Sequence, residues 1–297
     1  MKENYQLSWV VCENDDENIL RSFLIEKGIS KRALTAIKFS GGKIEVNGEE
    51  EDVRYKLKCG DTLSLTFPSE VRSAKLIPEE LPLEIIYEDE HLLVVNKPPF
   101  MNTIPSREHP SGSLANGLIH YYDKKKINGT IHIVTRLDRN TSGLLLIAKH
   151  SYVHSLLGKC QQNGHITRKY EALVQGKLSK PNGIIQAPIG RKDSSIIERE
   201  VRQDGQFSCT KYHLLSQFNS YAHVSLTLST GRTHQIRVHM SYIGHPLLGD
   251  DLYGGKKEDI HRQALHSKEL TFYHPIFQKE LTFTISLPSD MNSLIFK

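Results

Sequence analysis

A short run of polar residues, Thr135-Arg-Leu-Asp-Arg-Asn-Thr-Ser-Gly143, concentrates one acid, two bases and several small polar side chains in a single predicted turn. It places Asp138 between Arg136 and Arg139. A carboxylate with an opposite charge within a few ångströms is ionised and ready to act as a nucleophile or a general base. The alternative is an Asx turn, in which Asp138 and Asn140 only bond to nearby backbone.

A second group of polar residues lies in Thr230-Gly-Arg-Thr-His-Gln-Ile-Arg-Val-His239, where the pattern predicts a helix over 232–243. Arg237 lies beside the apolar face of this helix and is costly to bury unless it meets a carboxylate. His234 and His239 are five residues apart, which is a poor helical match for a shared metal, and no HExxH pattern occurs. We therefore predict that both histidines are structural.

Two further segments carry polar groups that could reach a ligand. Residues 168–174 read as an alternating strand in which Tyr170 is either a core residue or a ring that stacks on a base and offers its hydroxyl. The turn-rich loop over 244–255 contains Asp250 and Asp251. Because calcium loops alternate their ligands and this loop does not, a cation site is not expected there.

Several function classes are excluded by what the chain of 297 residues lacks. It contains no GxxxxGK[ST], no strand-anchored GxGxxG and no GxSxG, which disfavours nucleotide cofactors and serine hydrolysis. The four cysteines are scattered without a CxxC pair, which favours a reducing cytoplasm over a disulfide framework. No apolar run approaches the roughly 20 residues of a membrane helix, and the acidic start gives no sign of a secretory signal.

The N-terminal part carries a basic segment. Residues 18–39 contain a single acid and five bases: Arg21, Lys27, Lys31, Arg32 and Lys38. The apolar spacing predicts two short helices here, with Ser30 as the cap of the second, followed by strands over 43–48 and 61–67. Residues 68–82 hold three prolines and read as a linker. Taken alone, the bases describe a solvated helix face.

The remainder of the chain is rich in predicted strands. They cover 83–87, 91–96, 131–135, 144–148, 169–174, 209–216 and 221–228, with a helix over 152–163 in addition to that over 232–243. Many strands with few intervening helices predict an α+β domain with a largely antiparallel sheet. We place the boundary between an N-terminal module (1–75) and this domain (76–297) at the end of the linker.

Together, and in this order, the motifs resemble the RluA-type family of RNA pseudouridine synthases. The matching stretches are Asn96-Lys-Pro, Thr135-Arg-Leu-Asp-Arg-Asn-Thr-Ser-Gly-Leu-Leu-Leu, Arg168-Lys-Tyr, Gly231-Arg-Thr-His-Gln-Ile-Arg-Val-His, Gly244-His-Pro-Leu-Leu-Gly-Asp and Ala264-Leu-His with Phe-Tyr-His-Pro275. The segment before Lys75 is similar to an S4-type RNA-binding module. The fold implied is a catalytic domain around a mostly antiparallel mixed sheet, preceded by a small S4-like module.

The resemblance implies roles for individual residues. Asp138 is the essential catalytic aspartate, Tyr170 stacks on the flipped uracil and Arg237 pairs with Asp138, while Arg136 enters the RNA helix as the uridine leaves it. Arg139 would contact RNA as well. On the N-terminal module the expected RNA contacts are Arg21, Lys31, Arg32 and Lys38. No metal and no organic or nucleotide cofactor is expected.

Two positions depart from the family pattern. Thr135 stands where the family most often has His, and the NKP motif continues Pro99-Phe-Met-Asn without the usual glycine. Both concern the choice of RNA and the rim of the cleft rather than the reaction. A lone carboxylate suits isomerisation better than glycoside hydrolysis, which normally uses two. Whether Asp138 serves as nucleophile or base is left open.

We therefore expect a cytoplasmic, monomeric isomerase that converts uridine to pseudouridine in structured RNA, with 23S ribosomal RNA favoured over transfer RNA. Flipping the base costs a few kcal/mol, offset by stacking and an inserted arginine. One alternative is a non-catalytic RNA-binding or ribosome-assembly factor on the same scaffold. Another is a metal-dependent hydrolase that uses His234, His239 and Asp250.

Overall fold

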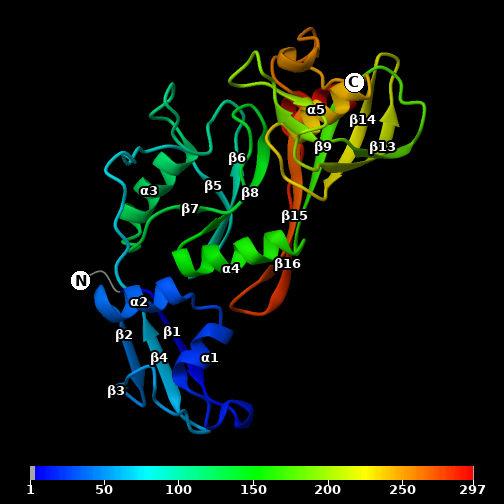
Figure 1. Ribbon diagram of the computed structural model, residues 1–297. Coiled ribbons are helices and arrows are strands. Elements are labelled where there is room, and N and C mark those ends of the chain that lie inside the picture. Colours follow the sequence, from blue (N-terminus) through cyan, green and yellow to red (C-terminus); the bar gives the residue numbers. More distant parts are fainter. Residues whose placement is uncertain (1–3, 297) are drawn as a thin grey trace.

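Two β-sheets organise the chain, and they lie at opposite ends of an elongated molecule (Figure 1). The structure is a computed structural model, and it describes residues 4–296. Residues 1–3 and 297, the outer ends of the two units expected from the sequence, lie outside this range. Within the described residues no helix combines the length and the apolar character that crossing a membrane requires.

The N-terminal unit is a four-stranded antiparallel sheet covered by two helices. Its strands follow the order β1-β4-β2-β3. The elements are β1 (Gln6–Val10), α1 (Leu20–Glu26), α2 (Lys31–Phe39), β2 (Lys43–Val46), β3 (Glu49–Glu50) and β4 (Thr62–Thr66). The two expected helices are confirmed, and the Ser30 side chain accepts a hydrogen bond from the Ala33 amide at 3.1 Å as the cap of α2. β1 was not expected from the sequence.

The larger unit is built on a ten-stranded mixed sheet with the path β10-β13-β14-β9-β15-β8-β6-β5, plus β16 on β15 and β7 on β8. Every pairing along it is antiparallel except that of β15 with β8. The strands are β5 (Glu84–Glu88), β6 (Leu92–Lys97), β7 (His132–Ile133), β8 (Ser142–Ala148), β9 (Ile166–Gln175), β10 (Asn182–Gln186), β13 (Cys209–Gln217), β14 (Tyr221–Leu228), β15 (Leu265–His274) and β16 (Lys279–Thr284). The expected α+β class is confirmed.

Four helices and a small hairpin surround this sheet. They are α3 (Leu114–Lys124), α4 (Ser151–Gln162), α5 (Gln235–Tyr242), α6 (Ser289–Ile295) and the pair β11 (Ile189–Arg191) and β12 (Arg199–Val201). The helix expected over 232–243 starts three residues late, which corrects the prediction. His234 adopts a left-handed conformation with φ +58°, and a turn rather than a helix therefore precedes Gln235.

Strand β15 joins the two halves of the sheet, because it pairs with β9 on one side and with β8, the strand that follows the polar turn at 135–143, on the other. Ser267 of β15 faces Gly143 of β8 in the parallel pairing. A Cβ atom at Gly143 would lie 2.3 Å from the Ser267 carbonyl oxygen, and its φ is +116°. Only glycine permits this close approach of the two backbones. The turn that carries Asp138 is thus anchored at its end to the middle of the sheet.

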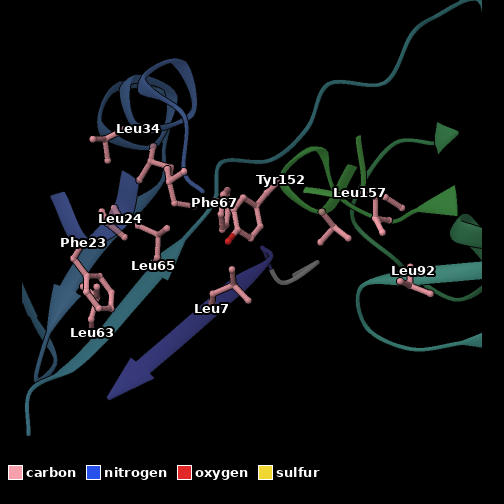
Figure 2. Close-up of a cluster of buried hydrophobic side chains, with 14 of the residues drawn as sticks. Leu7, Phe23, Leu24, Leu34, Leu63, Leu65, Phe67, Leu92, Tyr152 and Leu157 are labelled. Atoms are coloured by element: carbon pink, nitrogen blue, oxygen red, sulfur yellow. The ribbon is translucent and has the colours of Figure 1, made fainter. Parts of the chain in front are cut away.

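The two units share one apolar core. Figure 2 shows Phe67, at the end of the N-terminal sheet, beside Tyr152 of α4, with ring centroids 5.3 Å apart. The Tyr152 hydroxyl donates to the Lys27 carbonyl at 2.6 Å, and Tyr5 stacks on His150 at 3.6 Å. The segment between β4 and β5 has no helix or strand. It is nevertheless held against the larger unit, because the Glu70 carboxylate bonds to His132 Nε2 at 2.6 Å and accepts from the Ser151 amide.

Candidate active site

A small cavity of about 70 Å³ lies where the turn before β8, strand β9 and the start of α5 meet. Asp138, Arg168, Tyr170, His234 and Arg237 contribute its polar lining. Its apolar walls include Leu137, Leu228, Ile236 and Leu265. The three residues for which the sequence predicted catalytic roles therefore surround one space.

The Asp138 carboxylate points into this cavity and pairs with Arg237. Arg237 Nη1 donates to Asp138 Oδ2 at 3.2 Å. The turn itself closes through backbone, because the Thr141 amide donates to the Asp138 carbonyl at 3.1 Å. The Asp138 carboxylate bonds to Arg237 and Asn140 Oδ1 has no hydrogen-bond partner, so the Asx-turn alternative is wrong. Neither Arg136 nor Arg139, its neighbours in sequence, is the partner of the carboxylate; the paired arginine is Arg237, 99 residues further along the chain, as the resemblance to the family implies.

Arg237 is held more tightly by a second acid than by Asp138. Its Nε and Nη2 donate to the two carboxylate oxygens of Asp250, both at 2.7 Å, and its guanidinium lies 4.8 Å from the centre of the Tyr253 ring. Burial opposes the charge on Arg237, but Asp250 and Asp138 raise the pKa of its guanidinium above the usual value. The notion of a lone carboxylate thus needs correction: two acids share one arginine.

Tyr170 lies on β9 with its ring in the apolar core and its edge at the cavity. Only 4% of its surface is exposed. Burial and the nearby charge of Asp138 raise the pKa of its hydroxyl, while the adjacent Arg168 and Ser267 act in the opposite sense. The hydroxyl is therefore protonated at neutral pH. A planar base entering the cavity would find an apolar ring with a polar tip.

The two histidines of the α5 segment have different surroundings. His239 is completely buried, and its ring nitrogens bond to the Thr210 hydroxyl and the Ala187 carbonyl, both at 2.9 Å. This fits the structural role predicted for it. His234 instead lines the cavity, with Nε2 3.7 Å from Asp138 Oδ2. Sequence reasoning placed His234 away from the chemistry, because its left-handed backbone could not be foreseen from a helical pattern.

Two of the three metal ligands that the metal-dependent hydrolase alternative requires are already engaged by other groups. His239 uses both nitrogens inside the core, and Asp250 uses both oxygens on Arg237. Among residues 4–296 no group of three or more His, Cys, Asp or Glu side chains is arranged to hold a metal ion.

The polar turn is fixed from beneath by Lys97 of the NKP motif. Its fully buried ammonium donates to the carbonyls of Pro98, Met101 and Arg139 at 2.8, 2.8 and 3.1 Å. Burial lowers the pKa of this amine to about 7, against the opposing charge of Asp138. Phe100, in the stretch that lacks the usual glycine, adopts φ +64° and is exposed. The chain thus has a left-handed backbone conformation at a bulky residue, where a glycine would be free of steric strain.

Thr135, the other departure from the family pattern, faces inward. Its hydroxyl accepts a hydrogen bond from the Leu146 amide at 3.0 Å, and only 3% of the residue is exposed. The side chain is therefore used to fix the turn to β8 rather than to reach a ligand.

Arginines continue outward from the cavity, all of them exposed except the half-buried Arg199. A groove of about 430 Å³ shares Arg136, Gly231 and Arg232 with the cavity wall and adds Arg191 and Arg199 from the β11–β12 hairpin. None of these four arginines meets a carboxylate within 4.0 Å among the described residues. Arg139 is exposed on the same turn as Arg136. The remaining predicted RNA contacts, Arg21, Lys31, Arg32 and Lys38, are exposed on α1 and α2 of the N-terminal unit and do not join the cavity.

Comparison with known proteins gives a consistent result. A family model described as RNA pseudouridylate synthase matches residues 91–242. The chain is 52% identical over 276 residues to "Uncharacterized RNA pseudouridine synthase YjbO" of Bacillus subtilis (strain 168), covering 93% of this chain and 98% of that protein. It is 36% identical over 268 residues to "Ribosomal large subunit pseudouridine synthase D" of Yersinia pestis, covering 85% of this chain and 82% of that protein.

Among solved structures, "Human RNA Pseudouridylate Synthase Domain Containing 1" matches with a TM-score of 0.60 at 23% sequence identity. The match covers 73% of this chain and 95% of the human one. It shows that the two chains share a fold.

Proposed function

We propose that this chain, which belongs to the RluA-type family of RNA pseudouridine synthases and is an isomerase, converts specific uridines of large-subunit ribosomal RNA to pseudouridine. Asp138 is its catalytic carboxylate. The observation that carries the proposal is the ion pair of Asp138 with Arg237 in a cavity bordered by Tyr170. This geometry supports a reaction in which the Asp138 carboxylate acts on the ribose while the Tyr170 ring holds the uracil.

The chemistry follows from what isomerisation requires. The bond between C1′ and N1 of uridine breaks, the base turns, and C5 forms the new bond to C1′. Asp138 either attacks C1′ or removes a proton from C2′. Tyr170 provides a face on which the freed uracil stays while it turns. The apolar walls keep out water that would trap the sugar.

The target base must first leave its helix. We assign this step to Arg136, which is exposed at the mouth of the cavity, where it can occupy the space that the extruded uridine vacates. The arginine groove and Arg139 would hold neighbouring phosphates, since guanidinium groups without an internal carboxylate partner favour such contacts.

The N-terminal unit supplies a second RNA contact in this proposal. It is S4-like in its basic helices, and Arg21, Lys31, Arg32 and Lys38 project into solvent from α1 and α2. Because the unit shares an apolar core with the catalytic part, these charges are held at a fixed offset from the cavity. Such spacing suits a structured RNA better than a single strand.

The choice of large-subunit ribosomal RNA over transfer RNA is supported by relatives whose names specify the large ribosomal subunit, at 34–37% identity. Such a substrate places the enzyme in the cytoplasm, and we expect it to act as a monomer.

The proposal is tested by mapping pseudouridine at single-nucleotide resolution in total RNA from a strain that lacks this chain. We expect one or a few large-subunit sites to lose the modification and to regain it with the wild-type gene but not with the Asp138→Asn variant. Loss confined to transfer RNA would overturn the choice of substrate. Loss at no site, or rescue by Asp138→Asn, would favour the non-catalytic assembly factor.

A further inference from the structure

Arg168 is a buried arginine without a carboxylate. It lies on β9 two residues before Tyr170, and 8% of its surface is exposed. Within residues 4–296 it forms no ion pair within 4.0 Å, and its buried Nε has no hydrogen-bond partner. The other buried arginines differ: Arg237 binds Asp250 with two hydrogen bonds, and Arg262 binds Asp290 in the same way. Arg168 shares a hydrogen bond with the Tyr170 hydroxyl, but no carboxylate balances its charge. Burying such a guanidinium is costly, which favours an anionic partner among the molecules that bind here.

The guanidinium is placed to meet a molecule in the cavity. Arg168 belongs to the cavity lining together with Asp138 and Tyr170, and it lies beside the Tyr170 hydroxyl. On its other side is Gly231, where an added Cβ atom would lie only 2.9 Å from Arg168 Nη2. The missing side chain at Gly231 therefore leaves room for this guanidinium at the cavity wall.

The proposed reaction creates a negative charge at this place. When the C1′–N1 bond breaks, both of its electrons remain on N1, and uracil leaves as an anion with charge spread over N1, O2 and O4. If Asp138 attacks C1′, its carboxylate becomes a neutral ester. If it takes the C2′ proton, it becomes a neutral acid. In both cases one negative charge passes from Asp138 to uracil, and it returns to Asp138 when C5 bonds to C1′. The C5 proton is then lost to a base and N1 takes up a proton, which completes neutral pseudouridine.

The ion pairs already present in the cavity do not provide a cation for the uracil anion. Arg237 is engaged by both oxygens of Asp250 whatever the state of Asp138. Arg168 is the cavity-lining guanidinium of the described chain that is both buried and free of a carboxylate. Once a bound base covers the cavity, a positive charge in it interacts with a new anion far more strongly than it would in water.

Resting on the function proposed above, we propose that Arg168 is a further catalytic residue, which binds the detached uracil anion and holds it against Tyr170 while it turns. A phosphate is the less suitable partner. Phosphates remain on the outer strand when a base is extruded, and the exposed arginines of the groove, not the buried Arg168, face that strand.

The test varies the stability of the departing anion. Two hairpin transcripts would span the uridine mapped in the deletion strain, one made with uridine and one with 5-fluorouridine, whose base is the more stable anion because fluorine withdraws electrons. Single-turnover rates of C1′–N1 cleavage and RNA dissociation constants are measured for wild type, Arg168→Gln and Arg168→Lys. Lys169→Gln is the matched control, since Lys169 is partly exposed and pairs with Glu269 instead.

We expect Arg168→Gln to slow cleavage of the uridine substrate roughly 100- to 1,000-fold, with RNA affinity nearly unchanged. The loss should be several-fold smaller on 5-fluorouridine RNA, and Arg168→Lys should fall between. Equal losses on both RNAs, weaker binding with an unchanged rate, or no effect would each overturn the proposal. If Arg168→Gln does not fold, the same comparison is made with Arg168→Lys. An inactive wild type would instead refute the proposed function.

Discussion

Asp250 holds Arg237 through two parallel hydrogen bonds of 2.7 Å, whereas Asp138 meets the same guanidinium at 3.2 Å. Such a bidentate pair fixes the plane of the guanidinium as well as its position. The face of Tyr253 completes the fixation from the side. Arg237 is therefore set in place by Asp250 and Tyr253, and Asp138 receives a positive partner whose orientation does not depend on it.

Asp250→Asn is expected to lower the rate of the chemical step about 10- to 100-fold by loosening Arg237 beneath Asp138. Removing one partner of a buried pair is also expected to lower the free energy of unfolding by about 3–5 kcal/mol. Single-turnover kinetics and denaturant unfolding measure the two effects. Asp251→Asn is the matched control, because Asp251 is exposed and pairs only with Lys257. Equal behaviour of the two variants would refute this role of Asp250.

Lys97→Met should loosen the turn that carries Asp138. The substitution keeps the length of the side chain but leaves the carbonyls of Pro98, Met101 and Arg139 without their donor. We expect a loss of stability of about 2–4 kcal/mol, measured by denaturant unfolding, together with a slower chemical step. Lys124→Met on the exposed end of α3 should change neither. A stable, fully active Lys97→Met enzyme would contradict the account.

The N-terminal helices should contribute affinity rather than chemistry. Replacing Lys31 and Lys38 with Gln is expected to raise the dissociation constant for the RNA and to make its dependence on salt less steep. The rate at saturating enzyme should stay the same. The charge-preserving pair of Lys→Arg changes at these two positions serves as the control. If the Gln variant binds as the wild type does, these helices do not contact the RNA.

The contact between the two units should weaken in acid through His150, which stacks on Tyr5. Burial lowers the pKa of His150 to about 4, against the opposing charge of Glu70. The unfolded chain, with a pKa near 6.5, therefore takes up the proton first, and stability falls as pH drops from about 6.5 to 4. His150→Phe keeps an aromatic stack but removes this proton. Its Tm should therefore fall less between pH 7 and pH 5 than that of wild type. Parallel slopes would contradict this.

Local patterns were sufficient to predict the elements that carry the site, and the resemblance to the family implied the roles of Asp138, Tyr170 and Arg237. The turn at 135–143, the strand of Tyr170 and the helix of Arg237 all carry strong periodicity or turn chemistry, and the structure brings these three residues to one cavity. Spacing along the chain alone points to the neighbouring arginines, Arg136 and Arg139, as partners of Asp138. The pairing with Arg237 was implied only by the resemblance to the family, because the sheet register and not the spacing along the chain decides the distance.

The sequence did not predict elements whose residues have a low propensity for the conformation that they adopt. Strand β15 contains His266, Ser267, Lys268 and Glu269 in its first half, which hides its strand pattern even though it is the central strand of the sheet. Helix α3 contains Gly117, which lowers helix propensity. A Cβ atom there would lie 3.1 Å from the Leu83 side chain. A larger residue there would require the Leu83 side chain to move, and this packing is not visible in a single sequence.

The most direct test of the whole account is the single-turnover formation of pseudouridine by purified Asp138→Asn on the RNA identified in the deletion strain, measured together with RNA affinity. The substitution preserves size and removes the charge that Arg237 meets. We expect that no product forms while the dissociation constant changes less than about three-fold, because the RNA contacts lie elsewhere. Product formation at a rate near that of wild type would refute the catalytic role of Asp138.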